Sequence, residues 1–335
     1  MLLDPAILAL ISVSLVVSGL MLLASGFALS VIRHWNINSG SEYQLRLERR
    51  TYLISTIIAF CFTAELASLL LFVYTAEQLS SQFVGAMCAT GVLNINPWGW
   101  PTLFLKIAIF FAGVVWLTLN RIDNQAVDYP IIRRKYRLLL LILPLLLSEA
   151  VTQTRFFTQL DPHVITSCCG ALFTPENEGI AAEVSSIEPR ASLTMLVLSG
   201  AAMLIAGTFY LVKRRGERLF AFIGTIAFPI ALIGIVSCIA LYIYEHPHHH
   251  CPLCVLKGGH DFVGYLLYIP LFLGTAMSLS VASIAPLHKI PSLASVVPLE
   301  VHRRILYAIV LMLSFYVTAG AAILTSNLTM SGVWW

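Results

Sequence analysis

The stretch LFAFIGTIAFPIALIGIVSCIALYIY, residues 219–244, decides the fold because it contains no charged side chain. A helix of roughly 20 apolar residues crosses the hydrocarbon core of a bilayer. Seven further segments have the same character. The eight predicted spans lie at about 5–32, 51–77, 101–120, 138–158, 191–212, 219–244, 261–284 and 306–327. We therefore predict an all-α fold, a polytopic membrane helix bundle of about eight transmembrane helices that forms a single integral membrane domain over residues 1–335.

The composition supports this class of protein. Of 335 residues, 58% are hydrophobic and 11% are charged, whereas about a quarter of a soluble domain is charged. No stretch resembles a soluble domain or a nucleotide-binding signature. The expected surroundings are a lipid bilayer, and no nucleic-acid partner is expected.

Positive charge is concentrated in alternate loops. Most of the twenty lysines and arginines fall in loops 33–50, 121–137, 213–218 and 285–305. The positive-inside rule makes these loops cytoplasmic. Both termini are then extracytoplasmic, as are loops 78–100, 159–190 and 245–260. The expected location is a bacterial inner membrane.

Sulfur and imidazole groups crowd the loop that follows span 219–244. Its sequence is His246-Pro247-His248-His249-His250-Cys251-Pro252-Leu253-Cys254, and His260 follows shortly after. Such groups either cycle between dithiol and disulfide or hold a soft metal ion. We expect the next helix to begin at about Asp261. That start would place the C-x-x-C pair near a helix N-terminus, where the helix dipole lowers a thiol pKa.

Most of the seven cysteines lie in the loops predicted to face outward. These cysteines are Cys88, Cys168, Cys169, Cys251 and Cys254, and we predict that they are the redox residues. A disulfide between neighbours in sequence closes a strained ring, which leaves open a pairing of Cys168 or Cys169 with Cys88. The alternative interpretation is that these cysteines form structural disulfides between the loops. Cys61 and Cys238 lie within spans and are expected to be small buried hydrophobes.

The histidines offer an alternative to redox chemistry. His248, His249, His250 and His260, together with Cys251 and Cys254, are candidate ligands for copper or zinc. A histidine-rich loop can also be merely solvated. No haem is expected, because no histidine lies inside a predicted span and Val255 follows the C-x-x-C pair where c-type attachment needs histidine.

Three ionisable residues, Glu65, Lys106 and Glu149, lie within predicted spans. Ionisable groups in a membrane are costly and are usually paired. They form either an ion pair that joins helices, or a functional site such as a proton path or the polar wall of a cofactor pocket. Cys61, Glu65 and Ser68 are spaced i, i+4 and i+7, so they share one helix face, which we expect to point inward.

Two local patterns resemble a known family. Cys251-Pro252-Leu253-Cys254-Val255-Leu256 resembles the C-P-x-C helix start of bacterial vitamin K epoxide reductase-like proteins, and Cys88 before Gly99-Trp100-Pro101 resembles that family's loop cysteine before a G-x-P helix start. The resemblance implies that Cys251 and Cys254 are the pair that reduces a membrane quinone. It also implies that Cys88 belongs to a shuttle pair served by a thioredoxin-fold partner on the outer side. The chain departs from the family in having eight spans rather than four and no second loop cysteine near Cys88.

The leading hypothesis is a membrane thiol–disulfide redox protein with a quinone as electron partner. In this hypothesis Cys251 and Cys254 form the proximal pair, and Cys88, Cys168 and Cys169 form the shuttle. Glu65 or Glu149 would manage protons. The rivals are an outer-face copper- or zinc-handling protein and a non-catalytic membrane subunit of a larger complex. The redox hypothesis predicts that these sulfurs gather in space.

Overall fold

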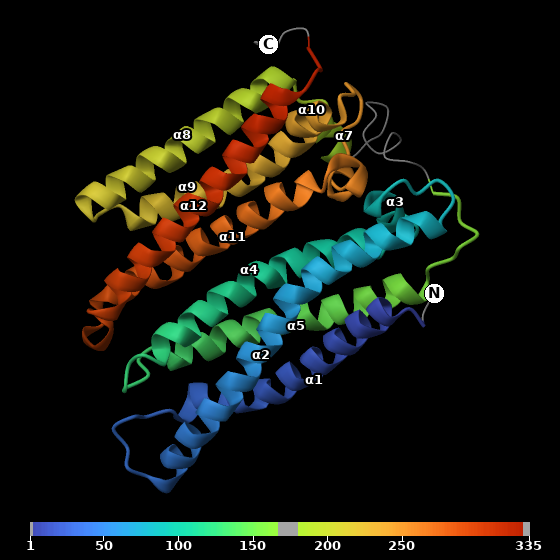
Figure 1. The fold of residues 1–335 in the computed structure, drawn as a ribbon. Coiled ribbons are helices and arrows are strands. Elements are labelled where there is room, and N and C mark those ends of the chain that lie inside the picture. The colour runs from blue at the N-terminus through green and yellow to red at the C-terminus, as the bar shows by residue number, and fades with distance from the viewer. Residues whose placement is uncertain (1–2, 167–179, 331–335) are drawn as a thin grey trace. The chain divides into compact units, whose positions relative to one another are not determined.

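The computed structural model describes residues 3–166 and 180–330, and every regular element in those residues is helical (Figure 1). Eight helices, or runs of consecutive helices, are long and apolar enough to cross a membrane. The predicted all-α class and the eight candidate spans are therefore confirmed. The long helices are α1 (Pro5–His34), α2 (Glu42–Leu79), α4 (Gly99–Asp123), α5 (Ile132–Thr158), α8 (Pro189–Lys213), α9 (Glu217–Gly234) continued by α10 (Ala240–Tyr244), α11 (Val263–Ile284) and α12 (Val296–Thr325).

Several helices begin earlier than hydropathy predicts. The helix α2 begins at Glu42 rather than 51, α5 at Ile132 rather than 138, and α12 at Val296 rather than 306. Leucine, arginine and glutamate are good helix formers, so these helices extend beyond their apolar centres. Several charges assigned to loops, Lys135 among them, therefore lie on helices.

The backbone divides into two compact units. Unit 1 comprises Met1–Thr75, Leu93–Asp161 and Pro286–Leu299, and unit 2 comprises Ala76–Val92, Pro162–Ala285 and Glu300–Trp335. Four long helices supply most of each unit. The single membrane domain expected from the sequence stays a prediction.

In unit 1, α5 packs against both α1 and α4. The core includes the fully buried side chains of Phe62, Trp116 and Tyr136. The rings of Phe62 and Trp116 lie 5.2 Å apart, and the absence of a side chain at Gly113 lets Phe62 approach α4. Large apolar side chains such as Leu23 are exposed, as expected for a surface that faces lipid rather than water.

In unit 2, α9 packs against both α8 and α11. Small residues allow this close approach. A Cβ added at Gly224 would lie 2.2 Å from the Ser278 Oγ atom of α11. A π turn, Ile235–Ile239, separates α9 from α10, and α10 ends at Glu245 in a left-handed conformation. This end of α10 starts the loop that contains the C-x-x-C pair.

The thiol pair does not lie at the start of α11, so that prediction is wrong. Cys254 begins a short 3-10 turn, Cys254–Leu256, whereas α11 begins only at Val263. Asp261 and Phe262 both have positive φ, 51° and 55°, which keeps the helix from extending backward. The dipole of α11 therefore gives no account of the reactivity of these thiols.

Candidate functional site: a buried cysteine cluster

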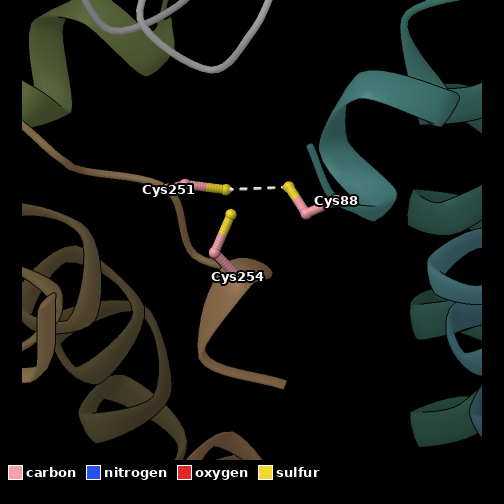
Figure 2. Close-up of side chains that lie close together, drawn as sticks. All are labelled: Cys88, Cys251 and Cys254. Carbon is pink, nitrogen blue, oxygen red and sulfur yellow. Dashed lines mark hydrogen bonds between the residues drawn. The ribbon is translucent and has the colours of Figure 1, made fainter. Parts of the chain in front are cut away.

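Three cysteines from two loops of unit 2 lie together. Figure 2 shows the sulfurs of Cys88, Cys251 and Cys254 pointing toward one another. The Sγ atoms of Cys88 and Cys251 are 3.4 Å apart, and all three sulfurs lie within 4.8 Å of one another. The three side chains are buried. The other two cysteines of the redox hypothesis, Cys168 and Cys169, lie outside the described residues.

The contact between Cys88 and Cys251 is not a disulfide bond. An S–S bond is about 2.05 Å long, and the observed separation is 3.4 Å. The hydroxyl of Thr90 lies 3.1 Å from the Cys251 sulfur. Cys251 therefore has a second cysteine and a hydroxyl group within contact distance, and sequence reasoning did not identify Thr90.

Local backbone contacts position Cys88. Thr166 N donates to Val84 O over 3.1 Å, and Gly85 turns the chain with a φ of +87°. The short helix α3 (Ala89–Leu93) follows, and its first amide, Ala89 N, donates to the Glu77 carboxylate over 2.8 Å. Glu77, at the end of α2, thereby fixes the residue next to Cys88.

Two tyrosines hold the C-x-x-C loop by its carbonyl groups. The hydroxyl of Tyr244 donates to Cys251 O and that of Tyr268 donates to Pro252 O, each over 2.6 Å. At Gly264, near the start of α11, an added Cβ would lie 2.8 Å from the Val255 backbone. Side chains from α10 and α11 thus satisfy an irregular backbone that would otherwise lack hydrogen-bond partners.

One ion pair joins the two cysteine-bearing segments. Lys257 Nζ lies 3.5 Å from Glu77 Oε1, and the two side chains are 37% and 11% exposed. A pair with this exposure contributes little stability. Its role is positional, because the same Glu77 carboxylate also accepts from the α3 amide.

The histidines of this loop contact other groups and do not join the three cysteines in a ligand group. The rings of His249 and His260 lie 4.1 Å and 4.7 Å from the Tyr244 ring. The Nδ1 atom of His250 lies 3.0 Å from Val236 O of the π turn. His248 donates its backbone N–H to the neighbouring His246. Within residues 3–166 and 180–330, the group of ligand atoms close enough to share a metal contains the three cysteines alone.

Two of these imidazoles bind a proton less readily than a free histidine does. Burial is the main cause that lowers the pKa of His250, and burial followed by the nearby His249 and Lys257 lowers the pKa of His260. The involvement of His248, His249, His250 and His260 in metal binding stays a prediction.

The charged residues predicted within spans form a second cluster, in unit 1. Lys106 Nζ lies 2.8 Å from Glu149 Oε1 and 3.9 Å from Glu65 Oε2, and it donates to Ser68 Oγ over 2.6 Å. All these side chains are buried, as is Cys61. The helix-joining ion pair and the inward face of Cys61, Glu65 and Ser68 are therefore observed. A cofactor-binding role for Glu65, Lys106 and Glu149 stays a prediction.

Sequence reasoning missed other parts of unit 1. Ser14 on α1 donates to Glu149 Oε2 over 2.6 Å, although a serine in an apolar helix gives little signal. Lys135, counted as a loop charge, is fully buried and lies 2.9 Å from Asp123 Oδ2. A signal existed for Glu77 of unit 2, because a carboxylate stands at the last position of predicted span 51–77.

An apolar cavity of about 360 Å³ lies between α8 and α12 of unit 2. Its lining includes Leu196, Gly200, Met312 and Tyr316 and contains none of the cysteines. It is therefore separate from the thiol site.

No protein-family model, no curated protein and no solved structure matches this chain. Its function is accordingly inferred from its own residues.

Proposed function

We propose that this chain is a membrane thiol–disulfide oxidoreductase that passes electrons between a protein dithiol and a membrane quinone. The observation that carries the proposal is the position of the Cys251 sulfur, 3.4 Å from Cys88 and in the same sulfur group as Cys254. A sulfur with two thiol neighbours can form either of two disulfides, and exchange between them moves electrons along the chain.

The reaction begins with a Cys251–Cys254 disulfide. The Cys88 thiolate attacks Cys251, which forms a Cys88–Cys251 bond and releases Cys254 as a thiolate. One thiol of the partner protein then attacks Cys88 and releases Cys251. The second partner thiol completes the partner's own disulfide and releases Cys88. The partner has lost two electrons, and Cys251 and Cys254 are both reduced.

The quinone restores the starting state. It takes two electrons and two protons from the reduced Cys251 and Cys254 thiols, which form their disulfide again while the quinone becomes a hydroquinone. The net reaction is a dithiol plus a quinone giving a disulfide plus a hydroquinone. The Thr90 hydroxyl is placed to donate to Cys251 when that sulfur is the attacking or leaving thiolate.

The proposal also states on which side of the membrane the cysteine cluster lies. Loops 78–100 and 245–260, which carry the three cysteines, hold few of the chain's lysines and arginines. The positive-inside rule then places the site on the extracytoplasmic side of a bacterial inner membrane, where disulfides persist. Reporter fusions at residue 216, between α8 and α9, and at residue 248 test this, since they should report opposite sides.

A quinone-reduction assay tests the activity. The full-length protein, fully reduced and freed of reductant, should reduce about one equivalent of a soluble quinone while two thiols disappear. The Cys251→Ser variant should reduce none, whereas the matched control Cys238→Ser should behave as the parent protein. Unchanged quinone reduction by the Cys251→Ser variant would refute the proposal.

A metal site is the second candidate, and the grouping of three buried sulfurs favours it. Two thiolates bound to one ion at about 2.3 Å in tetrahedral geometry lie roughly 3.8 Å apart, close to the 3.4 Å between Cys88 and Cys251. Thiolates suit Cu(I) and Zn(II). In this case protein purified under reducing conditions should contain one equivalent of metal, which Cys88→Ser should remove and Cys238→Ser should retain.

A further inference from the structure

Unit 1 contains a buried cluster with more carboxyl groups than cations. Lys106 lies 2.8 Å from Glu149 and 3.9 Å from Glu65. Among the described residues, the titratable groups near Glu65 include Lys106 on α4, Glu149 on α5 and Cys61 on α2 itself. The uncharged Ser14 of α1 is hydrogen-bonded to Glu149. Two ionised carboxylates and one ammonium would leave a net negative charge in the core, which is costly.

The two carboxyl groups are not equivalent. Glu149 accepts from Ser14 over 2.6 Å and lies 2.8 Å from the Lys106 ammonium, so this carboxyl group has both a hydrogen-bond donor and a cation beside it. Both Glu65 oxygens are buried without a hydrogen-bond partner among the described residues, and the Glu65 side chain is only 1% exposed. A buried carboxyl group in this position is stable when it is neutral.

We propose that Glu65 is a proton-binding site in the membrane-spanning core of unit 1, and that the Lys106 ammonium, which is paired with Glu149, is the cation beside it. The proposal is independent of thiol chemistry. Glu65 binds one proton as a neutral carboxylic acid and returns it to water as a carboxylate, so the cluster alternates between zero and one negative charge.

The position of Lys106 also suits the ionised state of Glu65. The two Lys106 distances differ by 1.1 Å (3.9 minus 2.8), so a small movement of the flexible lysine tip brings it equally close to both carboxylates. Ser68 accepts from the ammonium over 2.6 Å and holds it on the side of α2 that carries Glu65. Release of the proton therefore needs no rearrangement of helices.

A metal cation fits this cluster poorly. Hard cations such as Ca²⁺ take six or more oxygen ligands, and here the Lys106 ammonium lies 2.8 Å from Glu149 and 3.9 Å from Glu65. Its positive charge repels a second cation from the space between them. A proton needs only one Glu65 oxygen.

The same unit contains a matched control. Lys135 lies 2.9 Å from Asp123 and 3.0 Å from Asn120 Oδ1, and Asp123 also accepts from Ile131 N over 3.0 Å. This cluster has one carboxylate for one ammonium, and both side chains are fully buried. Its charges balance without a bound proton.

Infrared spectroscopy of the full chain in lipid nanodiscs tests the proposal directly. At neutral pH we expect a protonated-carboxyl stretching band that shifts in heavy water. Glu65→Gln should abolish it and Asp123→Asn should leave it in place. Glu149→Gln should also abolish it, because Glu65 then ionises to pair with Lys106. A band that survives Glu65→Gln, or its absence from the parent protein, would overturn the proposal.

Thermal unfolding supplies a second readout that does not depend on the spectrum. Because glutamine resembles a neutral carboxylic acid, Glu65→Gln should keep the parent unfolding temperature at neutral pH, whereas Asp123→Asn should lower it. A loss in Glu65→Gln as large as that in Asp123→Asn would mean that Glu65 is ionised. A rise in the parent's unfolding temperature in sodium chloride relative to choline chloride would indicate a sodium site instead. Either result refutes the proposal.

Discussion

The two units bury different kinds of functional side chain. Unit 1 buries ionisable side chains, among them Glu65, Lys106, Asp123, Lys135 and Glu149, on its long helices. Unit 2 buries thiols, and Cys88, Cys251 and Cys254 lie on its loops and short turns. The difference follows from the cost of burial. A thiol behaves as a small hydrophobe, whereas a buried charge needs a partner held at a fixed distance.

The scaffolds differ accordingly. Helices fix the spacing of Glu65 and Ser68 around the Lys106 ammonium. The C-x-x-C loop has an irregular backbone, and the Tyr244 and Tyr268 hydroxyls donate to two of its carbonyl groups. The comparison predicts that breaking the buried ion pairs of unit 1 acts on stability, and that changes around the thiols in unit 2 act on reactivity.

The largest expected effect comes from breaking the balanced ion pair of unit 1. Lys135→Met leaves the Asp123 carboxylate buried without its cation, which should cost about 3–5 kcal/mol of unfolding free energy. Chemical denaturation in detergent measures it. The double variant Lys135→Met with Asp123→Leu should recover part of the loss. If Lys135→Met were neutral, the charge clusters would not stabilise unit 1 as described.

A smaller effect is expected at the turn that leads to Cys88. Gly85 has a φ of +87°, and an added Cβ would lie 2.1 Å from Thr166 O. Gly85→Ala should lower the free energy of unfolding by about 1–3 kcal/mol and slow the attack of Cys88 on the Cys251–Cys254 disulfide. Gly40→Ala, where an added Cβ has open space, is the matched control. Equal behaviour of the two variants would show that this turn does not position Cys88.

The Tyr244→Phe variant tests whether the Tyr244 hydroxyl positions the C-x-x-C loop. It removes the hydrogen bond to Cys251 O and should lower the free energy of unfolding by roughly 1 kcal/mol. The rate at which a quinone oxidises the thiols should change as well. Tyr316→Phe, which removes a hydroxyl contact with Ser199 instead, should leave that rate unchanged. Identical rates for both variants would remove Tyr244 from the account of the site.

The smallest effect is expected at the partly exposed pair. Lys257→Met breaks the 3.5 Å contact with Glu77 and should change the unfolding free energy by no more than about 1 kcal/mol. Repeating the denaturation at high salt checks the cause, because the difference between parent and variant should shrink. A loss comparable to that of Lys135→Met would contradict the contrast between the units.

The sequence predicted what depends on local pattern. Long apolar runs identified eight candidate spans, and helical spacing identified the buried face of Cys61, Glu65 and Ser68. The approach of Cys88 to Cys251 was expected only as a general gathering of sulfurs, because it depends on how distant loops fold. The Thr90 contact depends on the same folding and was not foreseen.

Two errors concern the residue at which a helix begins. Hydropathy marks where a helix is apolar and does not mark where it ends, so Lys135 was counted as a loop charge although it lies buried on α5. The start of α11 was placed too early because positive φ values at Asp261 and Phe262 leave no pattern in a sequence of non-glycine residues.

Disulfide mapping of the Cys254→Ser variant tests the central claim most directly. With its usual partner removed, Cys251 should form a bond with Cys88 when the membrane-bound protein is oxidised by a quinone, and peptide mass spectrometry should detect that cross-link in most chains. Cys61 and Cys238 should remain reduced. If Cys251 stayed reduced, or bonded to another cysteine in preference to Cys88, Cys88 would not be the exchange partner and the proposed electron route would be wrong.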